Sequence, residues 1–148
     1  MILHMDAQQI IDANRYMTLA TADAQGTPWA SPVWFAHRDY REFLWVSDPE
    51  SRHSGNLAVR PELAIVIFDS GAAPPDGTGV YMTATAEQTT DDIELYSEQG
   101  VAQGLREWTL EDVTPPARFR LYRATVTDRW VLGEGSVRVR DVEGKQEQ

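Results

Sequence analysis

Apolar and polar positions alternate along most of the chain with the two-residue period of a β-strand. Together with the turn residues that flank it, this alternation predicts strands at residues 16–21, 28–36, 43–47, 63–69, 80–88, 118–132 and 136–142. Helical spacing is confined to residues 7–15, 54–59 and 91–99, with Asp6 as the expected N-cap of the first helix. Because these helices do not alternate with the strands, we expect a mainly β fold, an antiparallel barrel with two or three peripheral helices.

Three further segments add detail to this barrel. The run LAIVIFD at residues 63–69 is continuously apolar, which predicts a central strand covered on both faces. Proline and glycine exclude regular structure from residues 71–79. Residues 100–116 have a mixed pattern and receive no assignment. The expected total is therefore six or seven strands, with an irregular loop before the strand at residues 80–88.

The segment at residues 28–47 predicts a hairpin that is apolar on both faces. We expect Ala36 to lie opposite Phe43 across the turn, and the same register places Trp34 opposite Trp45 on one face. The opposite face then forms part of the barrel interior with Trp29, Val33, Phe35, Leu44 and Val46. The tryptophan face needs a second cover: another strand layer, a partner subunit, a flat ligand, or a loop or helix of the same chain.

Composition and charge narrow the class of protein. The 148 residues, 42% of them apolar, predict one domain over residues 1–148 with a disordered tail from about residue 143. A net charge of −10 excludes a general role on nucleic acid or anionic membranes, because such partners require a broad basic surface. The absence of cysteine excludes disulfides, thiol catalysis and thiolate metal sites. Without a secretion signal or a membrane-spanning run, we expect a soluble cytoplasmic protein.

The segment WVSDPESRHSGNLAVRP at residues 45–61 carries the candidate chemistry. Ser51 to Ser54 are expected at a helix N-terminus, where free backbone N–H groups and the helix dipole favour an anion. Arg52 adds a planar guanidinium, and the side chains of Ser51, His53 and Ser54 add further donors. With an indole face nearby, such a cradle favours a nucleotide-like cofactor that has a flat ring and a phosphate.

An ordinary solvated loop is the alternative interpretation of this segment. In that case Asp48 and Pro49 begin the helix, and Arg52 forms a surface pair with Asp48 or Glu50. The three histidines of the chain lack the spacing of metal ligands, so no metal site is predicted. No side chain is assigned as a catalytic acid or base.

Seven segments occur in an order that points to a known family: YMTLAT, DAQGTPWASPVWF, FLWVS, SRHSGNL, RPELAIVIFD, VYMTATAE and RLYRATVTDRWVL. Their order and spacing, from about Tyr16 to about Val139, resemble the pyridoxamine 5'-phosphate oxidase-like flavin and deazaflavin-binding proteins. The resemblance implies an antiparallel split β-barrel and a homodimer that holds cofactor in two clefts between subunits. The usual cofactor is flavin mononucleotide (FMN), with the deazaflavin coenzyme in a large bacterial branch and haem in a smaller one.

The resemblance also implies cofactor-binding positions on the strands. The backbone along the flavin ring matches Ser31, Pro32, Val33 and Trp34. The strand beside the ribityl chain and phosphate matches Trp45, Val46 and Ser47. A later strand that meets the cofactor contains Met82 and Thr83. Trp130 and Arg138 fall where residues of the other subunit close over the ring.

At the phosphate, Arg52 and His53 stand where the family has an Arg-Lys pair, followed by an Asn-Leu like Asn56-Leu57. His53 in place of lysine implies a phosphate partner whose charge fades near neutral pH. True pyridoxamine 5'-phosphate oxidases carry a C-terminal Arg and His for the substrate phosphate. This chain has no histidine after His53, so that reaction is not predicted.

The predicted function is an FMN-binding oxidoreductase that transfers a hydride to or from a small substrate. The flavin carries the hydride chemistry, and the protein supplies orientation, exclusion of water and hydrogen bonds that tune the ring. Two alternatives remain open at this point. One is a reductase that uses the deazaflavin coenzyme, and the other is a non-enzymatic flavin- or haem-binding or stress-related protein.

Overall fold

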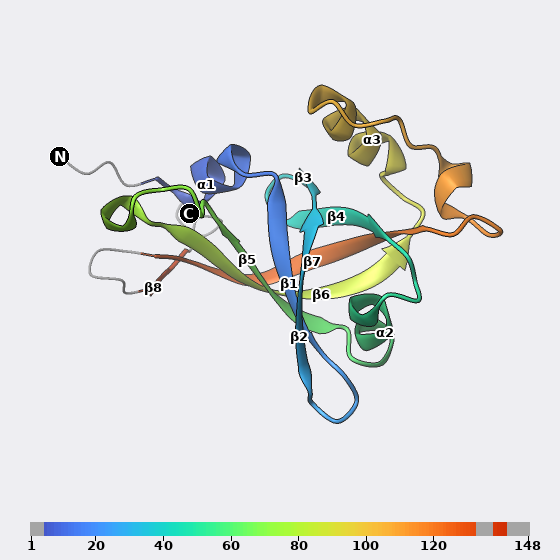
Figure 1. The fold of residues 1–148 in the computed structure, drawn as a ribbon, viewed down its shortest axis with the longest axis horizontal. Helices are drawn as coiled ribbons and strands as arrows, with labels where there is room; N and C mark the ends of the chain where they lie inside the picture. The colour runs from blue at the N-terminus through green and yellow to red at the C-terminus, as the bar shows by residue number, and fades with distance from the viewer. Residues whose placement is uncertain (1–4, 133–137, 142–148) are drawn as a thin grey trace, which may run out of the picture.

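The computed structural model describes residues 5–132 and 138–141, which form one curled antiparallel sheet with helices around it (Figure 1). The strands are β1 Tyr16–Ala22, β2 Pro28–Trp34, β3 Ala36–Arg38, β4 Glu42–Ser47, β5 Glu62–Phe68, β6 Gly79–Thr89, β7 Arg120–Leu132 and β8 Arg138–Arg140. The helices are α1 Ala7–Ala13, α2 Arg52–Val59 and α3 Ile93–Ala102, with short 3₁₀ helices at Pro74–Asp76 and Leu110–Val113. The predicted mainly β split barrel is confirmed, with eight strands instead of six or seven. The tail expected from about residue 143 lies outside the described residues.

The strand order across the sheet is β2-β1-β5-β6-β7-β4-β3, and β8 pairs with β7. β5 lies inside the sheet, as its apolar run predicts, but only one of its faces is covered. Leu63, Ile65 and Ile67 are buried, whereas Ala64 and Phe68 are exposed. The expectation that both faces of this strand are covered is therefore wrong for the single chain, because the outer face of the sheet stays open here.

The main core fills the barrel interior and includes residues of α1 and α2. Its larger members include Trp45, Tyr122, Phe35, Phe43, Met17, Met82, Leu19, Ile65, Ile67, Ile10, Ile11 and Leu57. The Gln9 backbone N–H donates to the Asp6 carboxylate at 2.8 Å, and the Asp6 N–H donates to the Gln9 side chain at 2.9 Å. This reciprocal capping box confirms Asp6 as the N-cap and fixes the start of α1, whose apolar side joins the core.

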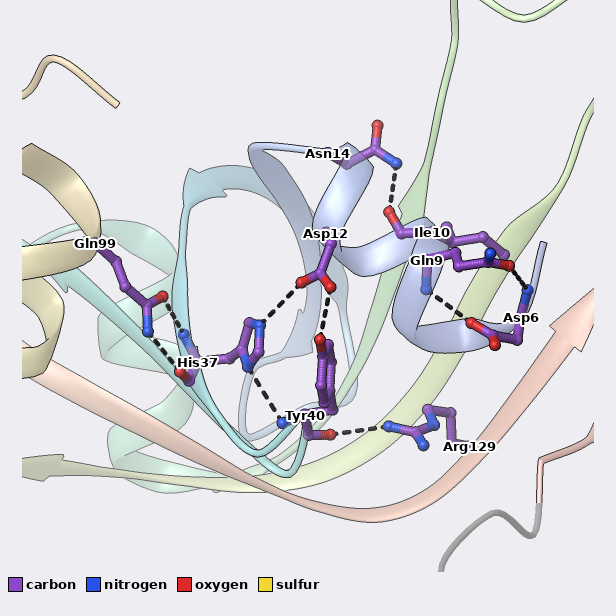
Figure 2. Close-up of polar contacts among 9 residues, drawn as sticks. All are labelled: Asp6, Gln9, Ile10, Asp12, Asn14, His37, Tyr40, Gln99 and Arg129. Carbon is purple, nitrogen blue, oxygen red and sulfur yellow. Dashed lines mark hydrogen bonds and ion pairs between the residues drawn. The ribbon is translucent and has the colours of Figure 1, made fainter. Parts of the chain in front are cut away.

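A hydrogen-bonded cluster fastens α1 to the β3–β4 turn and to α3 (Figure 2). Asp12 of α1 accepts a hydrogen bond from the Tyr40 hydroxyl at 2.6 Å and lies 3.4 Å from His37 Nε2. The Tyr40 backbone N–H donates to His37 Nδ1 at 3.2 Å, and the other ring nitrogen, Nε2, faces Asp12. Gln99 of α3 bonds the backbone N–H and C=O of His37 at 3.0 and 2.8 Å. α1 is therefore a packing helix that is tied to its neighbours.

A second, smaller core lies between α3 and the face of β4 that points away from the barrel interior. Its buried members are Ala36, Leu44, Ile93, Tyr96, Val113 and Leu121. Trp34 packs against this core, with its ring edge-on to Tyr96 at 5.1 Å and its Nε1 donating to Gln103 at 2.7 Å. A helix of the same chain thus covers the apolar hairpin, which was one of the four alternatives for that cover.

The predicted register of the hairpin is wrong by one residue. Ala36 pairs with Leu44, and the turn is made by Asp39 and Tyr40 with positive φ angles of 54° and 58°. The strand expected at residues 28–36 also breaks at Phe35. Its first part, β2, pairs with β1, and its second part, β3, is the part that pairs with β4. A three-residue connection at residues 39–41, two of them with left-handed backbone, and this break together change which side chains share a face.

As a result, Trp34 and Trp45 do not face each other. Trp45 lies in the barrel interior with 0% of its surface exposed, whereas Trp34 packs under α3. Leu44 and Val46, expected inside the barrel, belong to the second core. The expectation of paired indoles on one face of the hairpin, where a flat ligand was one possible cover, is therefore wrong.

Candidate functional site

The first turn of α2 lies where the sequence predicts an anion-binding helix N-terminus. Ser51 is the N-cap: its Oγ accepts from the Ser54 backbone N–H at 3.4 Å and donates to Ser54 Oγ at 2.7 Å. The alternative of a helix that begins at Asp48 is wrong, because Asp48 lies outside the helix and accepts from Arg118 Nε at 2.8 Å. Arg52 is therefore the first helical residue.

Arg52 is exposed, and its guanidinium carbon lies 4.2 Å from the ring centroid of Trp29. Trp29, near the start of β2, is 40% exposed and does not belong to the barrel interior, where the sequence analysis placed it. The Thr27 backbone N–H is the main cause that lowers the pKa of Asp23, and the charge of Arg52 lowers it further. Arg52 and Trp29 thus form an exposed, positively charged corner beside the β1–β2 turn.

His53 is buried, in contrast to the exposed Arg52 that precedes it. Its Nε2 lies 2.9 Å from Ser47 Oγ and 3.4 Å from Ser51 Oγ, and 8% of the residue is exposed. Burial lowers the pKa of His53 below its usual 6.5, so the ring is uncharged at neutral pH. His53 thus supports Ser47 and Ser51 from inside the protein and adds no second positive charge to the site.

Asn56 is also buried, one turn along α2 from Arg52. Its side-chain amide donates to Thr21 Oγ1 of β1 at 3.0 Å. Leu57 beside it belongs to the main core. The Asn-Leu pair that the resemblance matched to the phosphate region therefore anchors α2 to the sheet, and the helix N-terminus gains a fixed position.

Ser31, Pro32, Val33 and Trp34 lie on β2, which ends the strand order of the sheet. One backbone edge of β2 therefore has no strand partner in the described part of the chain. Such an edge presents N–H and C=O groups that can bond the polar rim of a flat heterocycle. The Trp34 indole packs under α3 and is therefore not free to contact a ligand. What β2 can offer a ligand is the backbone of its unpaired edge.

The three β4 residues matched to the cofactor lie behind the site. Trp45 is fully buried, Val46 packs against the second core, and Ser47 is 8% exposed and bonded to His53. The Nε1 of Trp45 has no hydrogen-bond partner among the residues that the structure describes. These side chains shape the position of α2 and do not line an open surface.

A groove of about 190 Å³ crosses the outer face of the sheet. Its lining comes from β1, β5, β6 and β7: Thr18, Ala20, Ala64, Ile65, Val66, Tyr81, Met82, Thr83 and Trp130. The structure thus brings three predicted site residues together, although the Met82 side chain is 1% exposed and belongs to the core. Arg138 pairs through its backbone with Leu132, and its side chain lies outside the described residues.

Sequence reasoning missed two features of this region. The contact of Trp29 with Arg52 joins residues that are far apart in sequence, and no local pattern indicates it. The groove could have been predicted from the sequence, because Ala20, Ala64 and Thr83 alternate with buried residues on their strands. Small or short polar residues repeated on one face of neighbouring strands indicate a face that another surface can approach closely.

Two other kinds of site were considered. Within residues 5–132 and 138–141, no three His, Asp or Glu side chains are grouped so that they could hold a metal ion. None of the helices in these ranges is both long and apolar enough to cross a bilayer. The candidate site therefore consists of the α2 N-terminus, the β2 edge and the groove.

Comparisons with known proteins agree with this architecture. The family model described as pyridoxamine 5'-phosphate oxidase matches residues 3–132. The heme storage protein HutZ of Vibrio cholerae has a TM-score of 0.67 and 22% identity, over 85% of this chain and 91% of its own. A heme binding protein of Mycobacterium smegmatis has a TM-score of 0.73 and 18% identity, over 95% of this chain and 59% of its own.

A putative 5-nitroimidazole antibiotic resistance protein of Bacteroides thetaiotaomicron has a TM-score of 0.67 at 12% identity, over 88% of this chain and 85% of its own. At such identities these likenesses show the shared fold. Because the chain covers 59% of the mycobacterial protein, that protein contains further sequence with no counterpart here. A comparison with curated proteins gave no match.

Proposed function

Because the chain belongs to the pyridoxamine 5'-phosphate oxidase family, we propose that it is an FMN-binding oxidoreductase acting on a small substrate. The observation that carries this proposal is the first turn of α2, where the exposed Arg52 begins an eight-residue helix. A bound flavin would supply the hydride chemistry, and the protein would bind it, orient it and exclude water.

The donor set of this chain fits a phosphate group. Arg52 offers a charged guanidinium, and the α2 N-terminus offers backbone N–H groups with the favourable helix dipole. Asp48, one of the two carboxylates that shortly precede Arg52 in the chain, is paired with Arg118 and accepts its Nε hydrogen bond at 2.8 Å. The unpaired edge of β2 would meet the ring, and buried His53 would keep Ser47 and Ser51 in place.

The first prediction compares two arginines of the same helix by titrating the purified apo-protein with FMN in a calorimeter. Arg52→Ala should weaken FMN binding about ten- to hundredfold, since a hydrogen bond to a charged group contributes about 1.5–3 kcal/mol. The matched control is Arg60→Ala, because Arg60 lies at the C-terminal end of α2 and donates to backbone carbonyls of the β1–β2 turn. Equal FMN affinity for the wild type and the Arg52 variant would show that the phosphate site is assigned wrongly.

The oxidoreductase part of the proposal needs its own measurement. The FMN-loaded protein should be yellow, and its flavin absorption should bleach when a nicotinamide donor is added under anaerobic conditions. Titration with the deazaflavin coenzyme distinguishes the other reductase: saturable binding of that coenzyme, together with absent FMN binding, would favour it. Binding of FMN without turnover by any donor would support a carrier.

We also propose that the protein is a homodimer with its cofactor between subunits. The groove on the outer face supports this arrangement, because its lining includes the exposed small side chains Ala20, Ala64 and Thr83, which leave room for a second surface. In a dimer, Trp130 and Arg138 of a second copy would close over the ring. The substrate would then enter between the two copies.

Haem is the second candidate ligand, because two proteins of similar fold are described as heme storage and heme binding proteins. We rank it below FMN because haem iron is commonly held by histidine, and both described histidines are engaged within the protein. His53 bonds Ser47, and His37 lies between Asp12 and the Tyr40 N–H. A hemin titration that gives a saturable Soret shift, with no response to FMN, would reverse this ranking.

A further inference from the structure

The contact between Arg52 and Trp29 differs from most arginine contacts of the molecule. Six arginines in the described ranges pair with carboxylates: Arg38, Arg106, Arg118, Arg123, Arg129 and Arg140. Arg52 forms no such pair with any described residue, and its guanidinium lies over the Trp29 ring at 4.2 Å. A carboxylate occupies guanidinium N–H groups, whereas an aromatic face attracts the charge and leaves those donors available.

The two partners of this contact stand on elements that are fastened together. Trp29 pairs with Thr21 in the β1–β2 register, and the Thr21 hydroxyl accepts from the Asn56 amide at 3.0 Å. Asn56 follows Arg52 by one helical turn, so both lie on neighbouring positions of the α2 surface. The indole and the guanidinium are therefore held in register before any ligand arrives.

We propose that Trp29 is a positioning residue, which holds the Arg52 guanidinium ready for the anionic end of the bound cofactor. This inference rests on the proposed function and adds a residue that neither the sequence analysis nor the family match assigns. An exposed arginine loses rotamer freedom when it binds an anion. The indole restricts that freedom in the free protein, so less ordering remains to be done on binding.

The test uses the purified full chain with Trp29→Ala, Trp29→Phe, Arg52→Ala and the Trp29→Ala/Arg52→Ala double variant. Each is titrated with FMN and with riboflavin, which has the same ring and no phosphate. Trp29→Ala should bind FMN about two- to fivefold more weakly, with riboflavin affinity unchanged, and Trp29→Phe should keep most of the FMN affinity. The double variant should bind FMN no more weakly than Arg52→Ala alone, because Trp29 acts through Arg52. Trp29 is 40% exposed, and circular dichroism of each variant should match the wild type.

Two results would overturn the assignment of Trp29. Equal losses for FMN and riboflavin would show that Trp29 contacts the ring or shapes the fold. Additive losses in the double variant would show that Trp29 and Arg52 act independently.

A measurement without flavin separates this inference from the proposed function. In the free protein, the NMR resonance of the Arg52 side-chain Nε–H should show a ring-current shift. This shift should disappear in Trp29→Ala, and inorganic phosphate should move the resonance in the wild type. If FMN fails to bind while this resonance is shifted and phosphate moves it, the proposed cofactor is wrong and the role of Trp29 stands. A resonance without the ring-current shift, or one that phosphate leaves unmoved, would overturn the inference.

Discussion

At the residue scale, the positive charge of the candidate site and the hydrogen bonds that support the α2 N-terminus come from different residues. Arg52 is exposed and carries the charge, whereas His53, which follows it in the chain, is buried and uncharged at neutral pH. His53 Nε2 lies within hydrogen-bond distance of Ser47 and 3.4 Å from Ser51, the N-cap of α2. Neighbouring residues of one helix turn thus have opposite roles, because successive positions of a helix point in different directions.

The burial of His53 predicts a loss of stability in mild acid. Because its pKa in the folded protein lies below 6.5, the unfolded chain takes up a proton at a pH where the folded chain does not. The free energy of unfolding should therefore be at its full value above pH 6.5 and fall as the pH drops toward 5. Urea unfolding at pH 7.5, 6.5, 5.5 and 5 measures this.

The matched variants for that experiment are His53→Gln and His37→Gln. His53→Gln should flatten the decline, since its amide does not titrate, whereas His37→Gln should keep the contribution of His53. Identical pH slopes for the wild type and His53→Gln would contradict the assignment.

The sequence predicted some of these residues because their signals are local. Ser51 to Ser54 stand at the beginning of a short helical pattern, so the N-terminus of the helix could be placed to within a few residues. Whether His53 points outward or inward depends on Ser47 of β4 and on the packing of α2 against the sheet. That packing is tertiary, and residue order alone does not encode which side of α2 faces the barrel.

At the element scale, β4 is the strand that both cores share. Phe43 and Trp45 face the barrel interior, and Leu44 between them faces the second core under α3. All three are 0% exposed. The helix α3 and the turn at Leu110–Val113 therefore contribute to stability by covering a face of the sheet that would otherwise be apolar and open.

Paired leucine variants test this cover. Leu44→Ala should lower the free energy of unfolding by about 2–5 kcal/mol, because it leaves a cavity in the second core. Leu110→Ala should change it by less than about 0.5 kcal/mol, because a surface side chain buries little area. Leu110 is 48% exposed, which makes it the matched control, and denaturant unfolding gives both values. Equal effects of the two variants would mean that the second core does not stabilise the fold.

The error in the hairpin shows where sequence reasoning reaches its limit at this scale. The apolar pattern of residues 28–47 correctly predicted strands there, but the strand expected at residues 28–36 is divided into β2 and β3. Their faces could not be assigned, because the turn placed Asp39 and Tyr40 in left-handed backbone and the chain broke at Phe35. A shift of one residue exchanges the faces of a strand, so a small error in the turn inverted β4.

At the scale of the whole molecule, the outer face of the sheet carries an open groove that is lined largely by apolar side chains. Thr18, Ala20, Ala64 and Thr83 line the groove there, and Trp130 lies at the same groove. The barrel class was predictable from the pattern and the resemblance. That this face stays open in one chain was not, because the apolar run of β5 resembles a strand buried on both sides.

A charge on this face tests the proposed dimer. Ala64→Arg should shift the protein from dimer to monomer, because it places an unpaired guanidinium where a second copy would pack closely. Ala102→Arg, at the exposed end of α3, makes the same chemical change on another surface and should leave the dimer intact. Light scattering after size-exclusion chromatography gives the mass of each variant. A wild type that is monomeric at micromolar concentration would contradict the dimer.

Because β4 is covered by a core on each face, its backbone amides should exchange with solvent differently from those of the edge strand β2. Phe43 and Leu44 have paired strands on both sides and packed layers above and below, so their amides have no local route to solvent. Deuterium should therefore enter this part of β4 only when the entire barrel comes apart, while the lone edge of β2 exchanges during brief fraying. The strand at the edge, beside which the cofactor is proposed to lie, can then adjust without disturbing the strand at the centre of both cores.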